Sequence, residues 1–396
     1  MSDPKSSEIS SRLQSISIPE LWVLLSAIVF CYCVLYGPQV ILNQWIIQYE
    51  LSAEWASALV YITLLPMSFA PLSYGYFLSQ QDTAKLITRS LLILSLSTLG
   101  MAFAQDALFI LICRFLQGLI LPVIMTSVMS RLSSVGGIYG KKLISYYLCA
   151  TVLGGLVGRL ITGYFNEWYS LDTLWIIWAI CIVAHVPCLA LTVKSKVPFN
   201  RHKIDFKQMK KICSNSKVRQ TLVVGALMFG VFAAALNILP LRATELGLGQ
   251  HSSSIANRYW GYIGGVIIAI YAQSLDQALG RRGYLPAWGM LLMASSLIWG
   301  TVSLNYAPLY IMVLGLCIGL FMTHPILAAF ITQLNPNERG LMSGLYVSSY
   351  YIGGVVFSIS SSLSLGLLGW KYTLYILTLF ALAGAYLTRK LFQSVE

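Results

Sequence analysis

The chain has 396 residues, of which 57% are hydrophobic and only 10% are charged, whereas soluble domains usually carry about 25% charged residues. A water-soluble core cannot bury so much apolar surface, so the composition excludes a soluble domain and predicts an all-α integral membrane protein. The formal net charge of +12 would suggest nucleic-acid binding in a soluble protein, but here the basic residues gather in alternate loops. That distribution indicates membrane orientation instead, and no nucleic-acid partner is expected.

Apolar segments fill most of the chain after a short polar tail at residues 1–19. A membrane-spanning helix needs about 20 apolar residues, and twelve segments come near that length. In chain order they are residues 21–47, 55–78, 86–104, 107–129, 143–165, 174–193, 221–241, 256–275, 285–304, 308–331, 341–363 and 372–387. No small-residue cleavage site follows the tail, so we expect the first segment to be retained as a helix.

A strongly basic stretch, residues 194–219, divides the chain near its middle. It holds nine lysines and arginines against a single acid, Asp205. A Lys or Arg at the centre of a membrane helix costs about 2.5–3.5 kcal/mol, so this stretch must lie in water. We therefore expect two membrane halves, residues 20–193 and 220–390, joined by an aqueous linker and followed by a tail at residues 391–396.

The charges of the other loops predict the orientation. Basic residues fall on the side of the linker: Lys85, Arg89, Arg131, Lys141, Lys142, Arg281, Arg282, Arg339, Arg389 and Lys390. The opposite loops carry Glu50, Glu54, Asp106, Glu167, Asp172 and Glu245, with Arg242 and Lys371 as basic exceptions. Because cytoplasmic loops are enriched in Lys and Arg, we expect both termini and the linker to face the cytoplasm.

A short pattern in the fifth segment returns in the eleventh. Tyr147, Gly154 and Gly155 recur as Tyr346, Gly353 and Gly354, at a constant offset of 199 residues. Tyrosine and glycine are common in this chain, so chance is the alternative explanation. The preferred interpretation is that two six-helix halves arose by duplication.

Ionisable groups at membrane depth are expensive, so each is a candidate functional residue. The candidates are Arg114, Arg159, His185, Arg258 and His324. No acid falls securely inside a segment, since Glu20, Asp106 and Glu245 lie at segment ends. The sequence thus predicts a cationic interior without a buried carboxylate.

Two interpretations stay open for the membrane arginines and histidines. Arg114 either holds neighbouring helices together or meets substrate or a proton-relay group. Arg159 follows glycines that give a smooth helix face for close packing, and we favour a role for it in a cavity or gate. His324 precedes a proline that frees a carbonyl, and an unperturbed imidazole titrates near about pH 6.5, so it is either a proton-coupling or a packing group. His185, placed in the outer half of its segment, is interpreted as structural.

The first segment offers Tyr36, Pro38, Gln39, Asn43 and Gln44, which we expect to face the bundle or a water-filled path. No catalytic motif is present: the sequence lacks GxSxG, HExxH and a Walker loop. The eight cysteines form no CxxC pair. We therefore expect no enzyme activity, no metal and no cofactor.

Several motifs together resemble the major facilitator superfamily, and more closely its drug:proton antiporter branch of the YnfM type. They are Leu35-Tyr36-x-x-Gln39, Arg114-x-x-Gln117-Gly118, the glycine-rich residues 154–163 around Arg159, His324, and residues 349–353. The resemblance covers nearly all of residues 20–390. It implies twelve transmembrane helices in two pseudo-symmetric six-helix bundles, and a part for the fourth-helix arginine in proton coupling.

The loop between the second and third segments departs from the family pattern. Gly75 is present, but Ser79 occupies the place of the usual acid. The matching loop in the second half keeps Asp276 and Gly280-Arg281-Arg282, with one extra residue between them. In the family this motif is thought to latch the halves in one state, so these residues are candidates for gating.

The sequence as a whole predicts a secondary active transporter, and not an enzyme, that moves a small organic solute by alternating access. The candidates for substrate binding or coupling are Tyr36, Gln39, Arg114, Gln117, Arg159, His324, Tyr346 and Tyr350. Because the internal charges are Arg and His, we expect an anionic or polycarboxylate solute such as a siderophore, exported in exchange for protons. Multidrug efflux, a lipid-modifying membrane enzyme and a non-transporting sensor are the alternatives. We expect a monomer in a bacterial inner membrane, with no partner beyond lipid, solute and protons.

Overall fold

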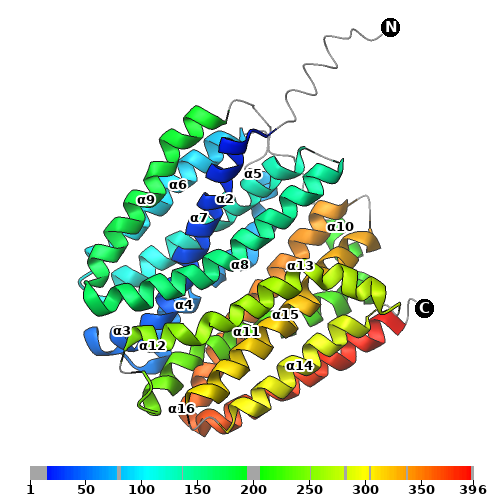
Figure 1. Cartoon of the computed structure of the whole chain (residues 1–396). Coiled ribbons are helices and arrows are strands. Elements are labelled where there is room, and N and C mark those ends of the chain that lie inside the picture. Colours follow the sequence, from blue (N-terminus) through cyan, green and yellow to red (C-terminus); the bar gives the residue numbers. More distant parts are fainter. Residues whose placement is uncertain are drawn as a thin grey trace.

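The computed structural model describes residues 16–77, 82–135, 137–193, 206–249, 251–280, 283–302, 305–335 and 338–393. Within these ranges the regular elements are helices that pack side by side (Figure 1). The elements before the linker are α2 (Ile18–Tyr36), η1 (Gly37–Ile41), α3 (Leu42–Gln48), α4 (Ala53–Tyr61), α5 (Leu64–Phe77), α6 (Thr83–Ala102), α7 (Ala107–Ser133), α8 (Gly137–Trp168) and α9 (Leu171–Thr192). The later ones are α10 (Phe206–Ser214), α11 (Ser216–Glu245), α12 (Ser252–Ala256), η2 (Asn257–Gly261), α13 (Tyr262–Ala278), α14 (Tyr284–Gly300), α15 (Tyr306–Leu334) and α16 (Arg339–Gln393).

All twelve predicted segments are present as helices. By length and composition, nine helices of the described chain could each cross a membrane. One of these is α16, whose 55 residues hold two predicted segments separated by a break at Gly369, where φ is 78°. The remaining two segments are α14 and the continuous run α12–η2–α13; α13 and α14 have 17 residues each, slightly below the usual spanning length of about 20.

Polar residues directly precede several helices and cap their first turns. The side chains of Ser17, Ser52, Asp82, Asp106 and Ser170 each accept a hydrogen bond from a backbone N–H in the first turn. Such N-caps satisfy N–H groups that the helix itself leaves unpaired.

Three helix ends differ from the predicted domain limits. The first is the start of α2 at Ile18, inside the predicted tail at residues 1–19. Asn215 caps α11, which therefore begins at Ser216, inside the predicted linker. At the other end α16 continues to Gln393, because Leu391 and Phe392 are buried against neighbouring apolar side chains.

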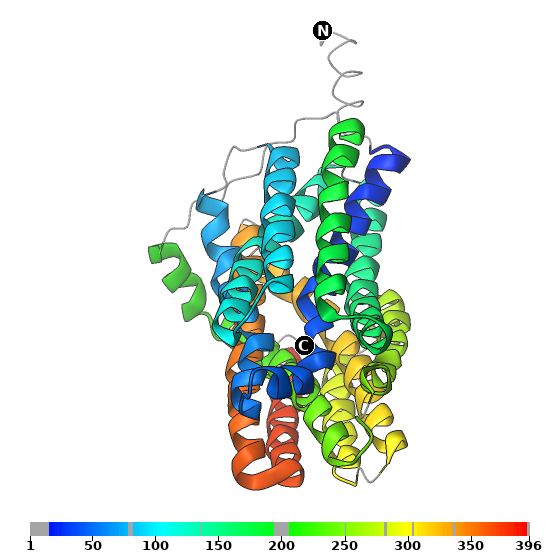
Figure 2. The same ribbon diagram turned by 90° about the vertical axis from the view of Figure 1, so that its left-hand side faces the viewer.

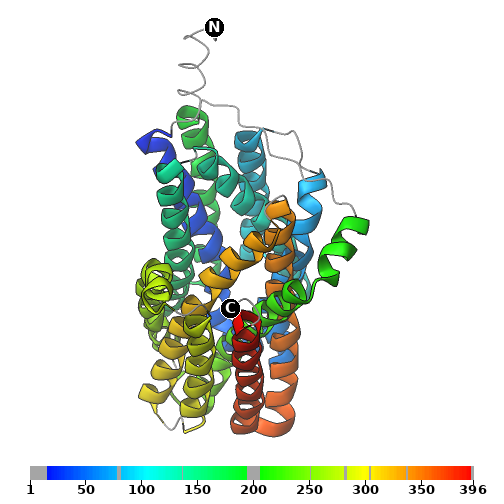
Figure 3. The ribbon, with the colours of Figure 1, turned by 90° about the vertical axis from the view of Figure 1, so that its right-hand side faces the viewer.

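The helices form two halves. Figure 1 shows α2 and α5–α9 together in the upper left of the molecule and most of α11–α16 in the lower right, with α3 and α4 at the lower left against α11. Seen from two sides, the first stretch of α16 (orange) runs up beside α5 (blue) and so joins the halves (Figures 2 and 3). The fold is thus a pair of helical bundles with an extended contact between them.

Glycines allow the same close helix contact in both halves. A Cβ added to Gly154 in α8 would lie 2.5 Å from the carbonyl oxygen of Val29 in α2. A Cβ added to Gly353 in α16 would lie 2.0 Å from the carbonyl oxygen of Ala226 in α11. These glycines are the repeated pair of the sequence, and each packs its helix against the first long helix of its own half. The equivalence supports duplication over chance.

Large apolar side chains cover the outside of the bundle. Leu96, Ile180 and Leu379 are exposed on three different helices. An apolar exterior of this kind is expected where the solvent is the hydrocarbon of a lipid bilayer.

A set of polar contacts ties the halves together at the end away from the linker. Gln44 in α3 donates to the Ser252 hydroxyl at 2.9 Å, and Asn166 in α8 donates to the same hydroxyl at 3.1 Å. Asn43 donates to the Pro240 carbonyl at 2.9 Å. Two of the polar residues singled out in the first segment therefore bridge the halves.

Candidate functional site

A small cavity lies between the two halves. Its walls come from α2, η1, α4, α5 and α8 of the first half and from α11 and α16 of the second. Its volume is ≈ 20 Å³, measured as the space open to the centre of a water molecule, which is room for about one water. The halves are thus closed around this point, and a solute can enter only when they separate.

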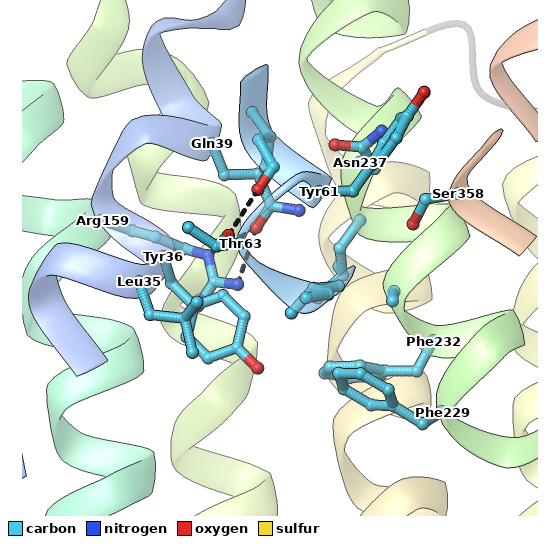
Figure 4. Close-up of a pocket in the computed structure, with 14 residues that line it drawn as sticks. Leu35, Tyr36, Gln39, Tyr61, Thr63, Arg159, Phe229, Phe232, Asn237 and Ser358 are labelled. Atoms are coloured by element: carbon cyan, nitrogen blue, oxygen red, sulfur yellow. Dashed lines mark hydrogen bonds between the residues drawn. The ribbon is translucent and has the colours of Figure 1, made fainter. Parts of the chain in front are cut away.

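Arg159 is the charged residue of the cavity wall. Its side chain is 1% exposed. Nε and Nη2 donate to the Oε1 atom of Gln39 at 2.8 and 2.6 Å, and Nη1 donates to the Gly155 carbonyl at 2.7 Å. The predicted candidates Gln39 and Arg159 are therefore direct partners, as Figure 4 shows.

Three tyrosine rings surround the Arg159 guanidinium. The guanidinium carbon lies 4.5 Å from the ring centre of Tyr36 and 4.7 Å from those of Tyr259 and Tyr262. The negative faces of aromatic rings attract a cation. Tyr36 belongs to the first half and the other two to the second. The three rings, which we call the tyrosine cage, therefore come together only where the halves meet.

No carboxylate neutralises this arginine among the residues that the structure describes. Their ion pairs join Arg131 to Glu20, Arg242 to Glu245 and His251 to Glu167. A buried guanidinium that is held by neutral groups alone attracts an anion. The arrangement suits a carboxylate or another planar anion.

The wall opposite Arg159 is neutral. Asn237 and Ser358 face the cavity from α11 and α16, and Phe229 and Phe232 line its edge (Figure 4). Tyr61 adds a further ring from α4. The cavity therefore combines one cationic pole with aromatic walls and a second, uncharged polar side.

His324, Tyr346 and Tyr350 form a second cluster. His324 Nδ1 lies 3.0 Å from the Tyr346 hydroxyl, and its ring centre lies 5.0 Å from that of Tyr350. Tyr350 stacks on Phe229 with ring centres 3.7 Å apart. Because Phe229 lines the cavity, an unbroken series of aromatic contacts joins His324 to the cavity wall.

Arg114 and Gln117 lie behind the cavity wall, since Arg114 donates to the lining residues Leu35 and Thr63. The Arg114 guanidinium donates to the backbone carbonyls of Val34, Leu35 and Leu59 at 2.8 to 3.1 Å. It also donates to Gln117 Oε1 at 2.8 Å. These contacts tie α7 to α2 and α4, and they match the helix-holding interpretation; the proton-coupling role of Arg114 stays a prediction.

The gating candidates are only partly described. Gly75 lies near the end of α5 and Asp276 near the end of α13, while Gly280 follows α13 with φ of 63°. Ser79, Arg281 and Arg282 lie outside the described residues. Their role in gating remains a prediction.

The expectation that the interior lacks a buried carboxylate was wrong. Glu20 is 3% exposed, and its Oε1 accepts a 2.7 Å hydrogen bond from Nε of Arg131. Arg131, interpreted from the sequence as a loop charge, is itself buried in the last turn of α7. The two residues are far apart in the chain, so only the packing of α2 against α7 reveals the pair.

The depth assigned to His185 was also wrong. The residue lies closer to Thr192, at the linker end of α9, than to Leu171. Its Nε2 is 3.0 Å from the Ser26 hydroxyl and its Nδ1 is 2.8 Å from the Cys181 carbonyl. Both ring nitrogens thus have partners, which agrees with a structural histidine.

Sequence reasoning missed four residues of the cavity region. Tyr259 and Tyr262 stand three residues apart and so share a helix face, but the chain has 23 tyrosines and nothing local distinguishes these two from the others. Asn237 and Ser358 are single neutral residues in apolar helices, without any local signal.

The fold and the cavity between its halves define a multi-pass membrane transporter. A family model described as Major Facilitator Superfamily matches residues 24–272, which is more than half of the chain. The chain therefore belongs to the major facilitator superfamily.

Relatives and solved structures agree with this assignment. An uncharacterized transporter of Buchnera aphidicola subsp. Schizaphis graminum is 23% identical over 336 residues, covering 82% of this chain and 80% of the relative. The uncharacterized MFS-type transporter YybF of Bacillus subtilis is 21% identical, covering 92% and 91%. The crystal structure of a bacterial homolog of the human lysosomal transporter Spinster, inward-facing and unoccupied, has a TM-score of 0.76 at 12% identity, covering 96% and 98%.

Proposed function

We propose that this transporter exports a small organic anion, such as a polycarboxylate or siderophore, across a bacterial inner membrane in exchange for protons. The observation that carries the proposal is Arg159, a buried guanidinium at the junction of the two halves to which no described residue offers a carboxylate. A site at such a junction can face one side of the membrane and then the other when the halves rock against each other.

Gln39 occupies the part of Arg159 that a carboxylate would bind. The Nε and Nη2 groups form the fork that accepts a carboxylate through two hydrogen bonds, and both now donate to one amide oxygen. An ionised acceptor makes stronger hydrogen bonds than a neutral amide. An incoming carboxylate therefore displaces Gln39, or shares the guanidinium with it, inside the tyrosine cage.

His324 is the better candidate for proton coupling than Arg114. The N–H groups of the Arg114 guanidinium are all engaged, mainly by backbone carbonyls, so loss of one proton would leave at least one buried acceptor unpaired. The imidazole of His324 lies against the hydroxyl of Tyr346 and reaches the cavity through Tyr350 and Phe229. Histidine exchanges protons near neutral pH more readily than any other side chain.

The orientation proposed from the loop charges places both termini and the linker in the cytoplasm. The outer side is then the end at which Gln44 and Asn166 hold Ser252. On that basis the proton gradient would drive solute from the linker side to the other. A monomer contains the complete site.

The test begins in cells in which the gene is deleted or overexpressed. Pools of small organic acids inside and outside the cells are compared, and we expect one anion to accumulate inside the deletion strain and outside the overproducer. The same anion is then measured in proteoliposomes with the wild type and with Arg159→Gln, for which we expect at least a tenfold loss, about 1.4 kcal/mol or more.

Arg258→Gln is the matched control, because Arg258 is an equally buried arginine outside the cavity wall. It donates to the Leu248 carbonyl at 3.3 Å and lies 4.8 Å from the ring of Tyr306. If both variants transport alike at equal protein level, Arg159 does not bind the anion. If the only change in cells is lost uptake of an added compound, the protein is an importer.

Multidrug efflux is the second candidate, and the aromatic walls favour it. Phe229, Phe232 and Tyr61 present flat apolar surfaces to the cavity, which suit lipophilic ring compounds. Drug tolerance that rises on overexpression and does not depend on Arg159 would select this function over anion export.

A further inference from the structure

Asn237 is a buried amide without a hydrogen-bond partner in the described protein. It is 2% exposed, and neither Nδ2 nor Oδ1 bonds to another protein group. The same residue type elsewhere in the chain is satisfied, since Asn43 donates to the Pro240 carbonyl at 2.9 Å. Asn237 lies in the cavity wall, so its amide is available to a solute.

Ser358 repeats the observation on a different helix. Its Oγ is buried and has no protein partner in the described ranges, although the residue is only 1% exposed. Ser349, on the same helix α16, instead donates to the Leu222 carbonyl at 2.7 Å. A buried serine normally bonds to a carbonyl of its own or a neighbouring helix. Ser57, Ser127 and Ser348 also lack a partner in the described ranges, but of these four serines Ser358 is the one in the cavity wall.

Buried polar groups without partners destabilise a protein, and they persist mainly where a ligand, an ion or water satisfies them. Here two such groups line one cavity together with Arg159. Figure 4 shows Arg159 and Gln39 on one side of this cavity and Asn237 and Ser358 on the other. The cavity thus has a charged pole in the first half and a neutral polar pole in the second.

We propose that Asn237 and Ser358 form a second subsite, which binds an uncharged hydrogen-bonding group of the same anion whose carboxylate Arg159 binds. An amide and a hydroxyl each offer a donor and an acceptor, so they suit a hydroxyl or a carboxamide. A second carboxylate only accepts hydrogen bonds and would leave Oδ1 of Asn237 unpaired. The inference rests on the proposed function and narrows its substrates to organic acids that carry a hydroxyl or an amide.

The apolar part of the cavity lining indicates the chemistry of the rest of this solute. Phe229, Phe232 and Leu236 also line the cavity, and they lie on the same helix as Asn237. An apolar body is therefore expected between the carboxylate and the polar group. Since the poles belong to different halves, a solute that contacts both poles joins the two halves, and the cavity must widen to hold it.

The test is a binding measurement on the purified full-length protein in lipid nanodiscs. The probes are straight-chain alkanoates from butanoate to octanoate, together with the same acids carrying a terminal hydroxyl or a terminal carboxamide. We expect the wild type to prefer the best polar probe over its parent alkanoate by about tenfold or more, the size of discrimination given by a site that hydrogen-bonds a ligand group. Asn237→Leu should reduce this preference to less than about twofold.

Ser349→Ala is the matched control and should keep the full preference. Arg159→Gln should weaken binding of polar and parent probes alike. If Asn237→Leu and Ser358→Ala both keep the preference while Arg159→Gln loses binding, the second subsite is wrong and the anion function stands. If Arg159→Gln has no effect, or the wild type binds none of the acids, the anion function fails.

Thermal unfolding without any ligand supplies a second measurement. Replacing an unpartnered buried polar group should not lower the unfolding temperature, so Asn237→Leu and Ser358→Ala are expected to match or exceed the wild type. Ser349→Ala should lower it, because that hydroxyl has a partner. A clear decrease for Asn237→Leu and Ser358→Ala would show that these groups are bonded inside the protein, for instance through one held water, and would overturn the subsite.

Discussion

Gln39 accepts two hydrogen bonds from Arg159 through a single amide oxygen. The Oε1 atom lies 2.8 Å from Nε and 2.6 Å from Nη2 of the guanidinium. This neutral oxygen takes the position that an ionised acceptor would take more strongly. The Nε and Nη2 groups of Arg159, which bind a carboxylate best, are therefore occupied by a weaker acceptor that an anion can displace.

The first prediction concerns the replacement of the neutral acceptor Gln39 by a charged one. Gln39→Glu places a carboxylate on the fork of Arg159, and the resulting buried ion pair competes with any incoming anion. We expect transport of the anion to fall at least tenfold, about 1.4 kcal/mol or more. The measurement is the initial rate of transport in proteoliposomes at equal protein content.

Gln48→Glu serves as the control for this change. Gln48 is the last residue of α3, which follows η1 with Gln39. It is exposed, and its side chain donates to the hydroxyl of Tyr49 at 3.1 Å. We expect its transport rate to stay within about twofold of the wild type, as for most exposed substitutions. Equal rates for Gln39→Glu and the wild type would contradict anion binding at Arg159.

The second prediction concerns proton coupling by His324. His324→Asn keeps a hydrogen-bonding group beside Tyr346 but cannot take up a proton. We expect the rate with and without an imposed pH gradient to differ by less than about twofold, since the titrating group is gone. Exchange of the solute across the membrane without a gradient should continue.

His185→Asn is the matched histidine control. His185 bonds to Ser26 and to the Cys181 carbonyl and lies in a different half of the molecule. The transport rate of His185→Asn should still change with an imposed pH gradient as in the wild type. A His324→Asn variant that still responds like the wild type would remove His324 from the coupling mechanism.

The fold was predictable because its signals are local. Stretches of about 20 apolar residues specify spanning helices, and residues such as Asp106 and Ser170 cap them. The repeat offset of 199 residues also carried real information, because Gly154 and Gly353 make equivalent close contacts. The ends of individual helices were less predictable, because a single capping residue such as Asn215 sets the start of α11 at Ser216.

The candidate site was predictable only on its charged side. Arg159 stands out because a charge in a membrane helix demands an explanation, and Gln39 and Tyr36 stand out as polar groups among aliphatic ones. Asn237 is one neutral residue in a long apolar helix, and its lack of a partner is visible only after the helices pack. The pairing of Glu20 with Arg131 likewise depends on tertiary structure.

The third prediction tests the repeated glycine contacts. Gly154→Ala and Gly353→Ala each force a methyl group against the backbone of a neighbouring helix. We expect each to destabilise the protein by about 1–3 kcal/mol, as overpacking does. The unfolding temperature in detergent measures the effect.

Gly140→Ala is the control on the same helix as Gly154. The nearest atom to an added Cβ there is 3.8 Å away, which is ordinary contact. The substitution should be neutral or stabilise by up to about 1 kcal/mol, because alanine favours a helix over glycine. If Gly154→Ala were tolerated as well as Gly140→Ala, the close approach of α8 to α2 would be wrong.

The fourth prediction concerns the ion pair of Glu20 and Arg131. Both side chains are almost fully buried, at 4% and 1% exposed, and the hydroxyl of Ser134 also accepts from Arg131. Removing one charge leaves the other buried without its partner, which typically costs about 3–5 kcal/mol. We therefore expect Glu20→Gln to lower the unfolding temperature strongly.

The pair of Arg242 and Glu245 is the comparison, because its side chains are 21% and 51% exposed and such surface pairs contribute about 0–1 kcal/mol. Glu245→Gln should thus unfold within a few degrees of the wild type, and the double variant Glu20→Gln/Arg131→Met should recover part of the lost stability because no buried charge is left unpaired. A double variant less stable than Glu20→Gln alone would mean that Arg131 contributes mainly through other contacts at the end of α7.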